Sequence, residues 1–131
     1  MTYKYTIRFN SIQNMLSNAE DIPFDENEWL IRDTNTNRIR PPKLIEFLHL
    51  LLNNLRYLSY ISWLNKNEGL FQIHDPEEVA HLWSQVKSRH TNNSMTFETF
   101  SRCIRYYYKN GSMLPTHTKY TYRFAINETD F

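Results

Sequence analysis

Glycine and cysteine are both scarce in this chain. Its 131 residues include two glycines, Gly69 and Gly111, and one cysteine, Cys103. A Walker phosphate loop and a dinucleotide-binding fingerprint each need several glycines within a short span, so the sequence excludes both. One cysteine cannot form a disulfide within the chain, and such a count is typical of a reducing compartment.

Long apolar runs are also missing. No run approaches the roughly 20 apolar residues of a membrane-spanning helix, and residues 1–5 lack the apolar stretch of a secretory signal. We therefore expect a soluble protein with no membrane partner. Apolar residues make up 40% of the chain and aromatic residues 15%, which is enough for one core and argues against wholesale disorder.

The sequence contains no catalytic or metal-binding pattern. Its five histidines are scattered, and none forms a His-x-x-x-His pair or stands at zinc-ligand spacing from Cys103. Glu77 and Glu78 could suggest acid–base chemistry, but they fall in the first turn of an expected helix, where they complement its dipole. We expect the protein to be neither an enzyme nor dependent on a cofactor or metal.

Positive charge is concentrated in the central part of the chain. Residues 1–40 contain five Lys and Arg against six Asp and Glu, residues 41–124 ten against six, and residues 125–131 none against two. The overall charge of +1 is therefore the sum of one mildly basic segment and two slightly acidic ones. A basic segment of this kind is compatible with nucleic-acid binding.

A domain boundary is expected at Arg40-Pro41-Pro42, because proline disfavours helix in the residue before it. Residues 1–40 show little periodicity and are interpreted as an N-terminal flanking region of unknown role. Residues 41–126 are predicted to form one domain and residues 127–131 a short tail. Because the apolar pattern after Pro42 looks complete, we expect the domain to fold without residues 1–40.

Helical and strand patterns alternate after this boundary. Apolar residues recur at helical spacing after Pro42, Asp75-Pro76 is a strong helix start, and Gly111 is a helix stop. The predicted fold is of the α+β class, with three helices and a small four-stranded antiparallel sheet. In the order α-β-β-α-α-β-β, the expected elements cover residues 42–54, 57–63, 70–73, 75–87, 96–110, 112–116 and 119–126.

The helix expected over residues 96–110 has two contrasting faces. One face is aromatic and apolar, with Phe97, Phe100, Ile104, Tyr107 and Tyr108, and the other bears Glu98, Thr99, Arg102, Arg105, Tyr106 and Lys109. Two arginines on a helix face are most often only solvated. Here, however, the helix follows another helix across a short turn and precedes a hairpin, which is the order of a winged helix-turn-helix. Arg102 and Arg105 project side by side, and each can grip O6 and N7 of a guanine in the major groove.

Seven short motifs between Pro41 and Phe124 point to one family. Arg102-Cys103-Ile104-Arg105-Tyr106-Tyr107-Tyr108 is the most specific of them. The others are Phe47-Leu48, Ile61-Ser62-Trp63, residues 69–73, residues 75–80 followed by Leu82-Trp83, Met95-Thr96-Phe97-Glu98, and residues 120–124. On these motifs, about two-thirds of the chain resembles the ETS domain.

The resemblance implies a nuclear regulator of transcription that binds double-stranded DNA at sites with a GGA core. It implies a winged helix-turn-helix that needs no cofactor and is monomeric on DNA, with Arg102 and Arg105 reading the paired guanines. Matched positions that contact the DNA backbone or groove are Leu44, Trp83, Lys87, Tyr106, Lys119 and Tyr120. Arg89, Thr99 and Lys109 complete the set of expected contacts.

Three departures from the family pattern bear on function. Ile45 replaces the first of three spaced tryptophans, Thr99 stands where a phosphate-binding lysine is common, and the wing at residues 112–118 is almost uncharged. Base reading is thus expected to be intact while phosphate anchoring is reduced. The alternative interpretation is a protein-interaction module on the same fold that binds DNA only weakly or with a protein co-regulator.

Overall fold

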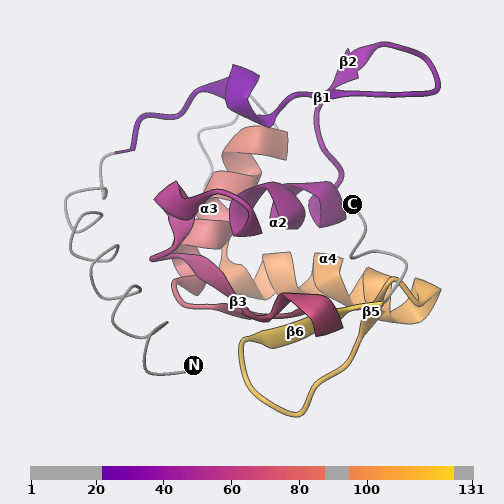
Figure 1. Ribbon diagram of the computed structural model, residues 1–131. Coiled ribbons are helices and arrows are strands. Elements are labelled where there is room, and N and C mark those ends of the chain that lie inside the picture. The colour runs from indigo at the N-terminus through magenta and orange to yellow at the C-terminus, as the bar shows by residue number, and fades with distance from the viewer. Residues whose placement is uncertain (1–21, 88–94, 126–131) are drawn as a thin grey trace.

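The computed structural model describes residues 22–87 and 95–125 (Figure 1). Its α-helices are α2 (Leu44–Leu52), α3 (Pro76–Lys87) and α4 (Phe97–Asn110). Its strands are β1 (Ile31–Arg32), β2 (Ile39–Arg40), β3 (Ile61–Asn65), β4 (Leu70–Ile73), β5 (Met113–Leu114) and β6 (Thr121–Phe124). The expected tail at residues 127–131 lies outside the described residues.

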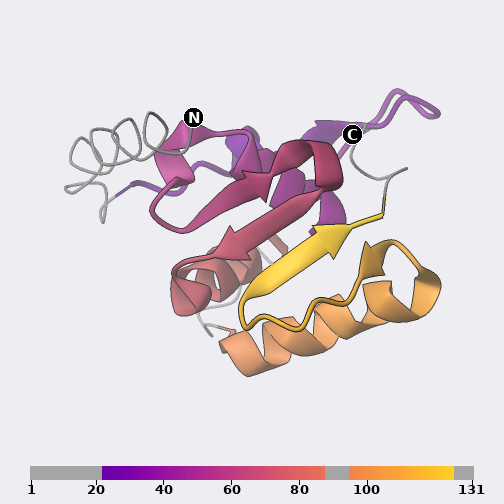
Figure 2. The same ribbon diagram turned by 60° about the horizontal axis from the view of Figure 1, so that its bottom comes forward.

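Four of these strands form one antiparallel sheet in the order β3-β4-β6-β5, and β1 pairs with β2 in a separate hairpin. Figure 2 shows α4 along one side of the molecule, beside β5 and β6. Three helices with a four-stranded antiparallel sheet confirm the predicted fold class. The strand expected at residues 57–63 begins later, at Ile61, because Asn54 accepts the Arg56 N–H and caps a 3-10 turn over Leu55–Tyr57.

Local capping signals place the two helices of the helix-turn-helix. The carboxylate of Asp75 accepts the N–H of Glu78 at 3.3 Å, at the start of α3. Thr96 Oγ1 accepts the N–H of Thr99 at 3.3 Å and thereby caps α4. At the other end of α4, Gly111 has φ +83°, a left-handed conformation that costs glycine nothing and ends the helix. The helix starts and stop predicted from sequence are thus confirmed.

The core lies where α2 meets the sheet and the other two helices. Phe47 is fully buried, and its ring centroid lies 5.0 Å from that of Trp83 on α3. Phe124 of β6 stacks on the buried His49 ring of α2, with centroids 4.1 Å apart. Ile45, which replaces a family tryptophan, is only 5% exposed and packs in the core.

Residues 22–40 also contribute to this core, so the prediction that the core is complete after Pro42 is wrong. Trp29 is 2% exposed, and its ring centroid lies 5.3 Å from Phe47 and 5.5 Å from Tyr57. The sequence pattern does not reveal this burial, because Trp29 follows a polar run at residues 25–28 and belongs to no apolar repeat. One large aromatic without periodicity gives no indication that it is buried.

An ionic cluster fastens the β1–β2 hairpin to the start of α2. Arg40 donates to both carboxylate oxygens of Glu46, at 2.7 and 2.9 Å, and to Asp33 at 3.1 Å. Glu46 also accepts the N–H of Lys43 at 2.8 Å, which satisfies a backbone donor at the helix start. The hydrogen bonds from Arg40 lower the pKa of Glu46 below its ordinary value.

This cluster makes stability depend on pH. Glu46→Gln is expected to lower the free energy of unfolding at pH 7 by about 1–2 kcal/mol, because a neutral amide loses charge-assisted hydrogen bonds. A carboxyl whose pKa is lowered by folding stabilises the protein above its unfolded pKa, and that contribution is lost as the pH falls through the folded value. Urea unfolding should therefore separate the two proteins at pH 7 but much less at pH 3. A gap of equal size at both pH values would contradict this account, and Glu77→Gln serves as the exposed control.

Candidate DNA-binding surface

The two faces of α4 are separated as the sequence predicts. Phe100 and Ile104 are buried in the core. The Arg102 side chain is 64% exposed and Tyr106 is 62% exposed. Arg105 and Lys109 are exposed as well. The outward face of α4 therefore presents three cations and an aromatic ring on a rigid helix.

The last two tyrosines of the Tyr-Tyr-Tyr run hold α4 in place. Tyr107 and Tyr108 are partly buried against the core, and this burial raises the pKa of each hydroxyl. A hydrogen bond from the Ile45 backbone opposes the rise at Tyr107. Since Ile45 is in the first turn of α2, this contact joins α4 to the α2 N-terminus.

Leu44 is the first residue of α2, and its side chain is buried in the core. Only its backbone can therefore reach a ligand. N–H groups in the first turn of a helix have no partner within the helix and carry partial positive charge. The arrangement suits the phosphate contact that the resemblance implies for this position.

Trp83 lies mainly in the core. It is 6% exposed, and its Nε1 is buried without a hydrogen-bond partner among the described residues. A buried N–H in this state costs roughly 1–3 kcal/mol. An acceptor from outside could satisfy it only after Trp83 or its neighbours move.

The base of the wing is attached to the start of α4. Tyr120 has φ +60°, which is uncommon for a residue with a side chain. Its carbonyl accepts the N–H of Ile73 at 2.8 Å, and its ring meets that of Phe97 edge-on with centroids 5.4 Å apart. Lys119 Nζ lies 4.9 Å from the same ring centroid. These contacts hold Lys119 and Tyr120 on the α4 side of the wing.

The remaining predicted contacts that the structure describes lie on α3 and α4. Lys87 is the exposed last residue of α3, and Thr99 is exposed in the first turn of α4, where its backbone takes part in the Thr96 cap. Arg89 lies outside the described residues. The structure thus places Thr99, Arg102, Arg105, Tyr106 and Lys109 together on α4.

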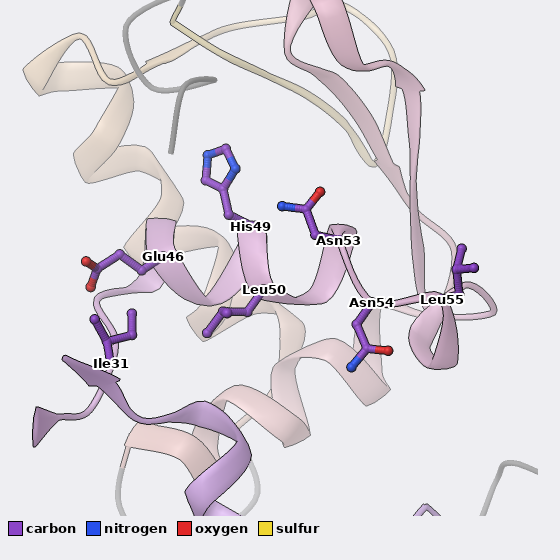
Figure 3. A pocket seen from close by; sticks show the side chains of 7 residues that line it. All are labelled: Ile31, Glu46, His49, Leu50, Asn53, Asn54 and Leu55. Atoms are coloured by element: carbon purple, nitrogen blue, oxygen red, sulfur yellow. The ribbon is translucent and has the colours of Figure 1, made fainter.

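Away from α4, a pocket of about 630 Å³ lies between β1 and α2 (Figure 3). Its titratable side chains are engaged in structural contacts, Glu46 with Arg40 and His49 with Phe124. Within residues 22–87 and 95–125, no three His, Cys, Asp or Glu side chains gather as a metal site. No helix in those ranges is long and apolar enough to span a membrane.

The Ets-domain family profile matches residues 41–125, which include all of α2, α3, α4 and the four-stranded sheet. The chain belongs to the Ets-domain family. Its fold is the winged helix-turn-helix of that DNA-binding family, and the resemblance inferred from the sequence motifs is confirmed. Ets domains are not enzymes, in agreement with the prediction for this chain.

Several curated transcription factors are similar to this Ets domain. Mouse ETS translocation variant 2 is 41% identical over 97 residues, covering 73% of this chain and 28% of that protein. Bovine Friend leukemia integration 1 transcription factor is 33% identical over 120 residues, covering 88% and 26%. Mouse SAM pointed domain-containing Ets transcription factor is 44% identical over 73 residues, covering 55% and 22%. The chain therefore spans about a quarter of the length of these relatives.

Proposed function

We propose that this Ets domain recognises duplex DNA with a GGA core by placing α4 in the major groove. Arg102 and Arg105 each make a bidentate contact with O6 and N7 of one guanine. The observation that carries the proposal is the exposure of both side chains on a helix whose opposite face is in the core. A helix fixed on one face and cationic on the other is suited to a groove lined by acceptors.

Phosphate contacts around this helix set the register of the domain on DNA. The N–H of Leu44 binds one phosphate from the positive end of α2. Lys87, Arg89, Lys109 and Lys119 supply cations, and the Thr99, Tyr106 and Tyr120 hydroxyls supply further donors. Trp83 can donate to a phosphate only if DNA binding exposes its indole N–H, because that group is buried in the free domain.

The wider role follows from the relatives, whose printed names describe transcription factors. We infer that the protein regulates transcription in the nucleus, and that residues 41–126 are its DNA-binding unit, monomeric on DNA. Residues 22–40 support this unit structurally through Trp29 and Arg40. We also infer that residues 127–131 are a short tail outside this unit.

A protein-interaction role is the second candidate, and the wing favours it. Between residues 112 and 118 there is no lysine or arginine, and Leu114 is 43% exposed. An uncharged wing with an exposed leucine suits a protein surface better than a phosphate backbone. In this case a co-regulator would supply the affinity that phosphate contacts do not.

A gel-shift titration without any partner distinguishes the two functions. The chain alone should retard a GGA duplex at lower concentration than a duplex with that core scrambled. Retardation that requires a second protein, or that is equal for both duplexes, would favour the interaction module. Both duplexes should share length and base composition, so that non-specific binding is matched.

The reduced anchoring predicts a shallow dependence of affinity on salt. Each neutralised phosphate adds about −0.9 to the slope of log K against log[salt], so the few cations around α4 give a slope of magnitude roughly 3–5. Thr99→Lys should steepen the slope by about 1 and tighten binding. The gain should be similar on GGA and scrambled duplexes, because phosphates position without specifying.

A salt series on both duplexes measures these slopes. A wild-type slope of roughly twice the expected magnitude would show that other basic residues, such as Arg32 and Arg38 of the N-terminal hairpin, also reach the DNA. Lys66→Ala, which removes an exposed cation on the turn between β3 and β4, is the control and should leave the slope unchanged.

A further inference from the structure

A carboxylate stands on the DNA-facing side of α4. Glu98 is the second residue of the helix, and its Oε1 accepts a hydrogen bond from Arg102 Nη2 at 3.0 Å. The two side chains are 74% and 64% exposed. One of the two arginines proposed to read guanine is thus bound to an acid when DNA is absent.

Glu98 contributes little to the stability of α4. An exposed ion pair four residues apart on a helix adds little to the stability of that helix. A carboxylate facing DNA is also repelled by the phosphates. An acid in this position therefore weakens DNA binding unless it makes a favourable contact there.

The chemistry of the major groove offers such a contact. Glutamate can accept a hydrogen bond from the N4 amino group of cytosine. In a G·C pair this amino group lies next to the guanine O6, because the two are hydrogen-bonded to each other. A guanidinium has five N–H donors, so Arg102 can use two for guanine and still bind Glu98. The carboxylate then lies beside the cytosine edge of the core.

We propose that Glu98 is a specificity-determining residue that accepts a hydrogen bond from the N4 amino group of a cytosine opposite the GGA guanines. The proposal rests on the proposed function, in which Arg102 reads one of those guanines. Arg102 and Glu98 together then read both bases of a G·C pair, one as donor and the other as acceptor. The ion pair seen without DNA holds the two side chains ready for this contact.

The test pairs protein and DNA changes in a double-mutant cycle. Each core cytosine is replaced in turn by 2-pyrimidinone, which keeps the ring but lacks the N4 amino group. Affinities of wild type and Glu98→Ala are then measured for the normal and modified duplexes. At one of the two cytosines, the modification should weaken wild type roughly tenfold more than Glu98→Ala, as expected for a hydrogen bond to a charged group.

Two further variants sharpen the result. Glu98→Gln keeps a carbonyl acceptor without the charge and should give an intermediate coupling. Glu77→Ala removes an exposed glutamate from the first turn of α3 and should behave like wild type. Unfolding of each variant, followed by circular dichroism, reports any loss of helix stability.

Equal weakening of wild type and Glu98→Ala at both cytosines would overturn the proposal. So would a Glu98→Ala protein that binds all duplexes more tightly by the same factor, because Glu98 would then only repel phosphates. If wild type shows no preference for the GGA duplex, the proposed function itself fails, and this proposal fails with it. The unmodified duplexes separate that outcome from the other two.

Discussion

Replacing Trp29 by alanine is expected to lower the free energy of unfolding by about 3–5 kcal/mol, the usual range for a fully buried tryptophan. Its ring contacts Phe47 and Tyr57, and the cavity left behind would lie against α2. Urea unfolding followed by fluorescence and circular dichroism measures the effect. Ile39→Ala, in the same N-terminal segment but at a residue 58% exposed, should cost less than about 1 kcal/mol.

A chain that begins at Arg40 should be destabilised for the same reason, although it retains every residue that the family profile matches. It also loses Asp33, which helps to hold Arg40 against Glu46, and Glu28, which accepts hydrogen bonds from Asn54 and Tyr57. Wild-type unfolding behaviour in either variant would show that residues 22–40 only cover the domain and do not support it.

Arg102→Ala and Arg105→Ala are each expected to lose the preference for a GGA duplex. Each bidentate arginine–guanine contact provides about 1–3 kcal/mol of discrimination. Weak binding to any duplex should survive, because phosphate contacts elsewhere provide it. Fluorescence anisotropy with GGA and scrambled duplexes at one salt concentration gives both affinities.

Lys109→Ala is the matched control for these arginines. It removes an exposed cation from the same helix but leaves both reading residues in place. Its affinity should fall by the same factor on both duplexes, because a phosphate contact carries no sequence information. A variant of either arginine that keeps full discrimination would show that α4 does not read the groove.

The elements of the winged helix were predictable because local signals and periodicity agree there. Asp75, Thr96 and Gly111 mark helix ends through hydrogen bonds and a left-handed turn that need no tertiary context. The helical periodicity of residues 96–110 puts Phe100 and Ile104 on one face and Arg102 and Arg105 on the other, as the structure does. Periodicity of this kind reflects which face is buried, and it is therefore visible in one sequence.

Features that depend on distant contacts were not predictable. Trp29 is buried only because Phe47 and Tyr57 surround it, and Arg40 is fixed by Asp33 and Glu46 rather than free at a boundary. The sequence also gave no sign that the indole N–H of Trp83 would be buried among core side chains. The spacing of four residues between Glu98 and Arg102 is visible in the sequence, but helical periodicity alone places Glu98 only on the polar face and does not show its ion pair with Arg102.

Selection from a randomised duplex pool tests the central claim most directly. The chain alone, without a partner, is incubated with the pool, and bound duplexes are recovered and sequenced over several rounds. The account predicts enrichment of sites containing GGA, and loss of this enrichment when Arg102 and Arg105 are both replaced by alanine. A pool that remains random, or that yields the same motif with the double variant, would contradict it.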